Sequence, residues 1–170
     1  FEKIQKVYSP KEFSMFIALS YTEMNELRAR KVNEAKKKGF NIVSYVSSNC
    51  TIFKTFSCGE NCFILEDNTI QPFVEIGNNV TMWSGNHIGH HSKIFDNAFI
   101  SSHAVISGGV EVGRNSFLGV NSTINDHIKL GEFSLIASGA LINKNTNDFS
   151  VCIGAPFKER DGIRSIDIKL

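Results

Sequence analysis

The chain has 170 residues, of which 42% are hydrophobic, and a formal net charge of +1. This length and composition fit one main domain with a buried core and a small appendage. The balanced charge excludes the basic surface that binds nucleic acids or anionic membranes, and with no bilayer-spanning apolar run and no secretory signal we expect neither nucleic acid nor a membrane as a partner.

Residues 1–45 form a predicted helical N-terminal segment. Ser9-Pro10 has the cap and first-turn residues of a helix start. A longer helix is predicted over residues 22–38, where a basic run followed by glycine marks the C-terminal end. The apolar stripe of this helix consists of Met24, Leu27, Val32 and Ala35. Residues 40–45 then predict a strand that leads into the next region.

A six-residue repeat dominates residues 46–147. Every sixth residue from Val46 to Ile142 is Val, Ile or Leu, except Cys58 and Met82. A second series, four residues later, holds mostly small side chains, and glycine often follows the aliphatic residue. Neither the 3.6-residue period of a helix nor the two-residue period of a strand explains a strict period of six.

This pattern predicts a triangular coil in which each hexad supplies one short strand and one corner. Three hexads make a turn of eighteen residues, so side chains eighteen positions apart stack, and the aliphatic residues form one continuous core. We therefore predict a mainly β protein with a parallel β-helix over residues 46–147 and a C-terminal tail over residues 148–170.

The four cysteines, at positions 50, 58, 62 and 152, raise the question of a metal site or a disulfide. The hexad register turns Cys58 and Cys62 inward among apolar neighbours, which favours buried structural thiols over either alternative. Free thiols in a core suit a reducing, cytoplasmic compartment.

All five histidines fall inside the repeat region, three of them between Trp83 and His91. Because Ile88 points inward in its hexad, His90 and His91 are predicted to face outward at a corner. An exposed imidazole is a candidate general base near neutral pH. The alternative is that these are ordinary solvated surface histidines.

Gly108 and Gly109 stack on His90 and His91, since the two pairs are eighteen residues apart. Two positions without side chains would leave room beside the histidines for a slender ligand and would expose backbone amides to it. Glycines also suit turns without any ligand. The combination of histidines and glycines makes a binding cleft the favoured interpretation.

These residues resemble the hexapeptide-repeat acyltransferases, in particular the sialic acid O-acetyltransferases and the N-acetyltransferases of nucleotide-linked amino sugars. The resemblance covers residues 21–158, and its most specific motifs are Asn86-His87-Ile88-Gly89-His90-His91, Ile106-Ser107-Gly108-Gly109-Val110, Phe117-Leu118-Gly119-Val120-Asn121 and Gly154-Ala155-Pro156. It implies a left-handed β-helix, acetyl-CoA as co-substrate, and a homotrimer with active sites between adjacent coils.

The resemblance assigns His90 and His91 to catalysis, with His90 as the base that takes a proton from the acceptor's amine or hydroxyl. The freed nucleophile would attack the thioester directly, while a backbone N–H, that of Gly108, holds the developing charge. The residues implied in CoA binding are Gly108, Gly109, Val120, Ser138 and Lys158. Those implied near the sugar are Trp83, Asn86 and His87; Trp83, like Phe95, also suits a subunit interface or simple exposure.

Two features depart from the family. The amino-sugar enzymes carry a glutamate after the catalytic histidine, where this chain has His91. They also carry a complete N-terminal α/β domain for the nucleotide, whereas residues 1–45 resemble only the end of that domain. The first departure implies that the base either lacks a carboxylate partner or recruits one from elsewhere. The second leaves open whether the acceptor is nucleotide-linked.

We therefore expect a cytoplasmic, acetyl-CoA-dependent acetyltransferase acting on an amino or hydroxyl group of a sugar, in the first instance a nucleotide-linked one, for surface glycan synthesis. One alternative is a zinc hydratase like the γ-class carbonic anhydrases, which share this fold and use three histidines. His91 and His127 are two coils apart, but Glu132 stands where the third histidine is expected, so no metal is predicted. The other alternative is an inactive trimeric scaffold.

Overall fold

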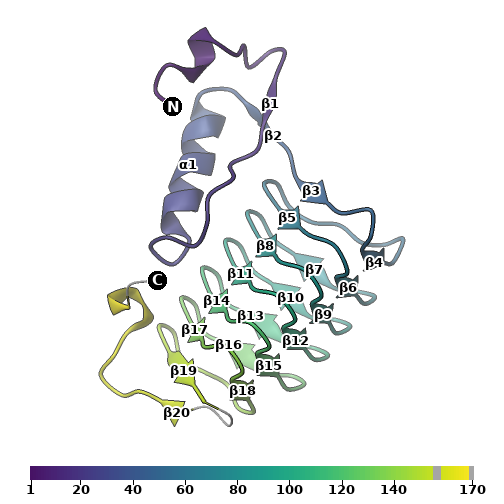
Figure 1. Cartoon of the computed structure of the whole chain (residues 1–170), viewed down its shortest axis with the longest axis vertical. Helices are drawn as coiled ribbons and strands as arrows, with labels where there is room; N and C mark the ends of the chain where they lie inside the picture. The colour runs from purple at the N-terminus through teal and green to yellow at the C-terminus, as the bar shows by residue number, and fades with distance from the viewer. Residues whose placement is uncertain (155–157, 169–170) are drawn as a thin grey trace.

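The computed structural model describes residues 1–154 and 158–168, which form an N-terminal segment with one helix, a β coil and a short C-terminal segment (Figure 1). The coil strands are two or three residues long and lie in three sheets. These sheets form the three sides of a triangular coil, so the predicted parallel β-helix is confirmed. Within the described ranges, no helix is long and apolar enough to cross a bilayer.

We name the three sides of the coil by their outward residues. The aromatic face contains β3 (Tyr45–Val46), β5 (Phe63–Ile64), β8 (Thr81–Met82), β11 (Phe99–Ile100), β14 (Phe117–Leu118), β17 (Leu135–Ile136), β19 (Val151–Ile153) and β20 (Lys158–Glu159). The histidine face contains β4 (Thr51–Ile52), β6 (Thr69–Ile70), β9 (His87–Ile88), β12 (Val105–Ile106), β15 (Thr123–Ile124) and β18 (Leu141–Ile142). The ion-pair face contains β7 (Glu75–Ile76), β10 (Lys93–Ile94), β13 (Glu111–Val112) and β16 (Lys129–Leu130).

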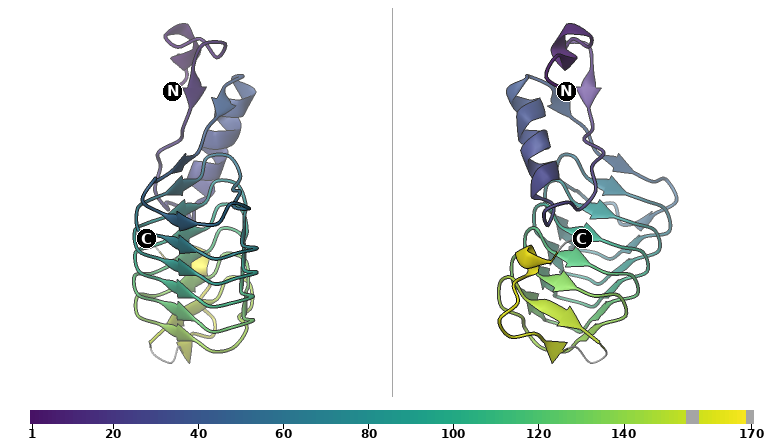
Figure 2. Two further views of the ribbon diagram at one scale, coloured as in Figure 1. Left: turned by 90° about the vertical axis from the view of Figure 1, so that its right-hand side faces the viewer. Right: turned by 60° about the vertical axis from the view of Figure 1, so that its left-hand side comes forward.

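Backbone hydrogen bonds join each coil to the next, and Figure 2 shows the resulting stack of strands. The pairing is parallel and in register, so that His87 lies beside Val105 and Lys93 beside Glu111, eighteen residues on in both cases. The inward aliphatic side chains fill the interior, and Ile88 at its centre is 0% exposed. Burying each such side chain contributes about 1.5–3 kcal/mol, which makes the column of aliphatic residues the main stabilising feature.

The two ends of the coil depart from the hexad pattern. Ile52, predicted to point inward, is 41% exposed because β4 is the terminal strand of its sheet and no earlier coil covers it. At the other end, β19 pairs with β17, Leu135 lying beside Val151 at a spacing of sixteen residues. The stacking therefore continues past Asn147, where the hexad register stops, because the last turn is two residues shorter.

The N-terminal segment contains a 3-10 helix (Ile4–Lys6), β1 (Ser14–Met15), α1 (Glu26–Lys37) and β2 (Asn41–Ile42), with β1 parallel to β2. The predicted helix start at Ser9-Pro10 is wrong. The chain makes only a turn there, in which the N–H groups of Glu12 and Phe13 donate to the Ser9 carbonyl, and it then extends into β1. The strand predicted over residues 40–45 is divided between β2 and β3.

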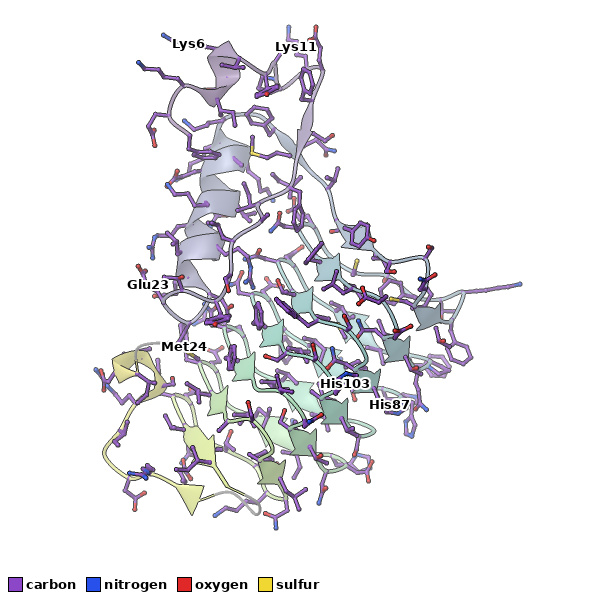
Figure 3. The ribbon with its side chains drawn as sticks, viewed as in Figure 1. Lys6, Lys11, Glu23, Met24, His87 and His103 are labelled. Atoms are coloured by element: carbon purple, nitrogen blue, oxygen red, sulfur yellow. The ribbon has the colours of Figure 1, made fainter. Side chains whose placement is uncertain are left out.

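Helix α1 begins four residues later than predicted. Glu23, Met24 and Asn25 all have positive φ, a left-handed conformation that a right-handed helix cannot contain. Val32 and Ala35 of the predicted apolar stripe are buried against the N-terminal segment. Met24 instead packs on the far end of the aromatic face, and Figure 3 shows it in the loop at the end of α1 nearest the coil.

A column of asparagines joins the N-terminal segment to the coil at the corner between the ion-pair and aromatic faces, here called the asparagine corner. The column consists of Asn61, Asn79, Asn97 and Asn115, all with positive φ. Each side-chain amide donates to the next one, over 2.8, 2.8 and 3.1 Å. The first accepts from the N–H of Ile17 at 2.8 Å, and the last donates to the carbonyl of Met24 at 2.9 Å. The N-terminal segment thus binds both ends of the column.

Arg28 of α1 reaches this column and is 1% exposed. Its guanidinium donates to Oδ1 and the backbone carbonyl of Asn79 at 3.0 and 2.9 Å and to the carbonyl of Ser20 at 3.1 Å. Burial lowers the pKa of Arg28 to about 10, because the charged form has lost solvent. Carbonyl dipoles, and not a carboxylate, are the hydrogen-bond partners of this buried cation.

All four cysteines are free thiols. Cys62 is fully buried as the register predicts, and Cys152, which lies beyond the hexad register, is fully buried as well. Cys58 is only half-buried, since it lies in the poorly covered first coil. A hydrogen bond between the two thiols lowers the pKa of Cys58 to about 7 and raises the pKa of Cys62. Burial raises the pKa of Cys152 to about 12.

Replacing Arg28 tests how far the N-terminal segment depends on this contact. Arg28→Ala leaves several buried carbonyls without a donor, so we expect a loss of about 3 kcal/mol in unfolding free energy, measured by chemical denaturation. Arg30→Ala is the matched control, because Arg30 makes an ion pair with Glu23 in which both side chains are 52% exposed, and such pairs contribute about 1 kcal/mol or less. Equal unfolding midpoints for the two variants would contradict the assigned role.

Candidate functional site

The corner between the histidine face and the ion-pair face, here called the His90 corner, carries two columns of turn residues. The first column is Pro72, His90, Gly108, Asp126 and Lys144. The second is Phe73, His91, Gly109, His127 and Asn145. From residue 73 to residue 127 every member of the second column has positive φ. The predicted stacking of His90 and His91 against Gly108 and Gly109 is confirmed.

His90 and His91 are both exposed, and their rings touch. The two Nδ1 atoms lie 3.1 Å apart in a hydrogen bond, and the ring planes are nearly perpendicular, at 85°. The N–H of His90 donates to Oε1 of Gln71 at 3.0 Å. On its other side, the ring of His91 stacks on Phe73 with centroids 4.8 Å apart. The corner therefore holds both imidazoles in defined orientations, with Nε2 of His90 not engaged by His91.

Gly108 is needed because the His90 ring occupies the space beside its α-carbon. A Cβ there would lie 2.8 Å from Cε1 and 2.9 Å from Nε2 of His90, closer than real contacts allow. The prediction that the two glycines expose their amides is wrong, however. The N–H of Gly108 donates to Oδ1 of Asp126 at 2.9 Å, and that of Gly109 donates to the His90 carbonyl at 2.8 Å.

Asp126 was not identified from the sequence, although it stands thirty-six residues after His90, two coils along the same column. Its carboxylate accepts a hydrogen bond from the Gly108 N–H, the same group that the resemblance assigns to the developing charge on the thioester oxygen. In this structure Gly108 can hold a developing negative charge only if Asp126 first gives up that hydrogen bond. This hydrogen bond also places the Asp126 carboxylate next to Gly108, the residue on which the His90 ring lies.

His127 continues the second column but does not join the histidine pair. Its ring lies against Gly109, where a Cβ would come 2.5 Å from Nδ1. Gly109 thus lies between His91 and His127, which are two coils apart. In residues 1–154 and 158–168, no group of three or more His, Cys, Asp or Glu side chains is placed to hold a metal ion.

The residues predicted near the sugar occupy three different environments. Asn86 is 1% exposed, its amide nitrogen donates to the Trp83 carbonyl and its oxygen accepts from Ala104 at 2.8 Å. The buried Asn86 side chain therefore bonds to the backbone of the coil and does not line an open site. His87 is half-buried on the histidine face, and with His103 it lies on the side of the coil away from α1 (Figure 3). Trp83 follows β8 and is 49% exposed.

The residues predicted to bind CoA do not meet within one chain. Gly108 and Gly109 lie at the His90 corner, whereas Val120 and Ser138 are exposed on the corner between the aromatic and histidine faces, here called the His103 corner. These corners lie at opposite ends of the strands of the histidine face. Lys158 begins β20, and its side chain lies outside the described residues.

A cleft of about 190 Å³ lies between the N-terminal segment and the aromatic face. Residues 16–20 form one wall, and the other consists of Phe63, Thr81, Trp83 and Phe99. Tyr21 meets the edges of two rings of this face with centroids 5.0 Å apart, which fixes the segment over it. The sequence did not indicate this cleft, because it forms only where residues far apart in the chain cross.

Residues 91–126 match the family described as bacterial transferase hexapeptide (six repeats). This match covers two full coils, including the His91, Gly108 and Asp126 positions of the site. No curated protein matches the chain in sequence.

Solved structures share the fold at low sequence identity. PerB from Caulobacter crescentus, in complex with CoA and GDP-perosamine, is 20% identical with a TM-score of 0.88, covering 94% of this chain and 75% of that one. The acetyltransferase domain of PglB from Neisseria gonorrhoeae, with acetyl coenzyme A, is 19% identical with a TM-score of 0.86, covering 92% and 75%. AntD, an N-acyltransferase from Bacillus cereus, is 17% identical with a TM-score of 0.64, covering 78% and 89%. These likenesses confirm the left-handed parallel β-helix.

A single methyl group tests the contact between Gly108 and His90. Gly108→Ala would force the His90 ring to turn away, while the backbone of residue 108, which does not have positive φ, accepts alanine. We expect the ring resonances of His90 to shift in ¹H–¹³C NMR spectra with little change in the unfolding midpoint. Ser138→Ala, at the equivalent turn position of the His103 corner, is the control. Unchanged His90 resonances in Gly108→Ala would contradict the packing described.

Proposed function

We propose that this chain is an acetyl-CoA-dependent acetyltransferase that modifies an amino or hydroxyl group of a sugar, with His90 as the general base. The observation that carries the proposal is the exposed His90 imidazole, which bonds to His91 and lies against the side-chain-free Gly108, while Gln71 accepts from the backbone N–H of His90. An imidazole whose Nδ1 is bonded to its neighbour can still accept a proton at Nε2.

The reaction is a direct transfer. As the acceptor's nitrogen or oxygen attacks the thioester carbonyl, Nε2 of His90 takes its proton. The new C–N or C–O bond forms, the C–S bond breaks, and the proton passes from His90 to the departing CoA sulfur, so that His90 ends neutral. Because no covalent enzyme intermediate is needed, positioning the two substrates against His90 is the main contribution of the protein.

The solved structures support a sugar acceptor and a CoA donor. Their names describe CoA bound together with GDP-perosamine, acetyl coenzyme A bound to an acetyltransferase domain, and dTDP-4-amino-4,6-dideoxyglucose bound with CoA. All three names include coenzyme A, one of them as acetyl coenzyme A, and two include an amino sugar on a nucleotide. We therefore propose a nucleotide-linked amino sugar as the first acceptor to test, and a cytoplasmic role in surface glycan synthesis.

A homotrimer would bring together the CoA-binding residues that one chain keeps apart. Gly108 lies at the His90 corner, and Val120 and Ser138 lie at the His103 corner. If three copies pack with the His90 corner of one against the His103 corner of the next, all three residues would line one groove, with Lys158 near its end. Val105 and Val120 are 40% and 42% exposed in the single chain and would be covered in such an assembly.

Exchange of His90 tests the proposal. Thiol release from acetyl-CoA is measured with a panel of nucleotide-linked amino sugars and free sugars, and His90→Ala is expected to lower kcat by about 10²- to 10⁴-fold, the usual contribution of a general base. The variant should keep the oligomeric state and acetyl-CoA binding of the parent, measured by light scattering and calorimetry.

His127→Asn is the matched control, because it removes another imidazole of the same corner, one that does not face Gly108, and asparagine tolerates positive φ. We expect it to retain most of the turnover. Parent-like turnover in His90→Ala would exclude the base. If acetyl-CoA fails to bind the parent protein, the inactive scaffold becomes the better account, and stoichiometric zinc in active protein would favour the hydratase.

A further inference from the structure

The Nδ1 atom of His90 has another imidazole as its partner. It lies 3.1 Å from Nδ1 of His91, at the position where the related acyltransferases have a carboxylate. A histidine general base needs a group at Nδ1 that fixes its orientation and its tautomer. An aromatic ring, that of Phe73, lies on the other side of His91.

We propose that His91 is the positioning residue for His90, holding the tautomer that leaves Nε2 free to accept a proton, and that Phe73 in turn fixes the ring of His91. This inference rests on the function proposed above for His90. It makes the site a chain of three rings, in which Phe73 packs on His91 and His91 bonds to His90.

The hydrogen bond between the two rings restricts their protonation. One Nδ1 must donate and the other must accept, so the contact cannot exist with both rings doubly protonated. When His90 donates, its proton lies on Nδ1 and its Nε2 is the free base. Once His90 has taken the acceptor's proton, the same bond becomes charge-assisted, and His91 can share the positive charge. His91 can thus orient His90 and stabilise its protonated form, the two tasks that a carboxylate would perform at this position.

The turn position of Phe73 is unfavourable for its backbone, and its ring is the part that makes a specific contact. The backbone has φ 64° there, a conformation that phenylalanine rarely adopts, and the side chain is 64% exposed. The equivalent turn position of the asparagine corner holds asparagine in four successive coils. The contact that distinguishes Phe73 is its stacking on His91, with centroids 4.8 Å apart and planes inclined at 35°.

The other ionisable groups near His90 and His91 either contact other residues or belong to the turn columns of this corner. Asp126 accepts from the Gly108 N–H, and His127 lies against Gly109. Glu75 and Lys93, on the adjoining ion-pair face, pair with each other at 3.0 Å. The remaining ionisable members of the corner are Lys54 and Lys144. The group in contact with Nδ1 of His90 is His91, so exchange of His91 should have the largest effect on the pH profile.

Exchange of His91 gives two opposite expectations. His91→Glu restores a carboxylate, which stabilises the protonated form of His90, so the acid limb of the kcat/KM profile should move up by about one pH unit. His91→Asn keeps a residue that tolerates the left-handed turn but removes the ring, and kcat should fall about tenfold or more with KM unchanged. In ¹⁵N NMR spectra, neutral His90 of the parent should carry its proton on Nδ1, and His91→Asn should show a mixture of tautomers.

Phe73→Asn separates the effect of the Phe73 ring on catalysis from any effect on folding. Asparagine suits positive φ, so the unfolding midpoint should stay the same or rise, while kcat falls about threefold or more because His91 is less well held. Phe133→Asn is the matched control: it makes the same exchange at another left-handed turn, where the phenyl ring stacks on Phe149. It should lower the unfolding midpoint and leave kcat unchanged.

The outcomes separate this inference from the proposed function. An unmoved acid limb in His91→Glu, or an unchanged kcat and tautomer in His91→Asn, would overturn the role of His91 even if His90→Ala is inactive. An unchanged kcat in Phe73→Asn would overturn the role of Phe73 alone. If His90→Ala is fully active, the proposed base is wrong, and the NMR tautomer measurement still shows whether His91 orients His90.

Discussion

Parallel backbone hydrogen bonds between residues one coil apart are the constraint on which this structure depends. They fix the spacing between coils, and they place each side chain directly over the one eighteen residues earlier. Because a coil buries its inward face only against its neighbours, no coil is stable alone, and stability grows along the stack. The uncovered Ile52 of the first coil shows what is lost where a neighbour is missing.

The same constraint creates the candidate site. Each corner needs a residue with positive φ, and this requirement recurs once per coil at the same place. At the asparagine corner the requirement is met by asparagines, which bond to one another and to the N-terminal segment. At the His90 corner it is met by Phe73, His91, Gly109 and His127. The residues of the candidate site therefore lie in the turns at a corner and not in the strands, which are only two residues long.

The N-terminal segment is bound by polar contacts as much as by apolar ones. Arg28 is buried without a carboxylate partner and is stabilised by carbonyl groups of the coil and of the segment itself. Such a contact is specific, because its donors match one arrangement of acceptors. It also holds residues 16–20 over the aromatic face, where they complete the cleft beside Trp83. Thus Arg28 of α1 helps to position the segment that forms one wall of this cleft.

The sequence by itself determined the coil, its register and the stacking of His90 on Gly108, because a period of six leaves the chain few other ways to bury its aliphatic residues. It failed where no period exists. The chain makes a turn and no helix at Ser9-Pro10, and α1 starts late beyond a loop that a distant residue contacts, through the bond from Asn115 to the Met24 carbonyl.

Only the tertiary structure decided which polar atoms remain free. Periodicity places a residue at a corner, but it does not say whether its amide already has a partner, and here Asp126 occupies the Gly108 N–H. It likewise could not show that the side chain of Asn86 is bonded within the coil, or that His91 turns its Nδ1 toward His90. Repetition sets positions along and around the coil, whereas hydrogen-bond partners depend on side-chain orientation in three dimensions.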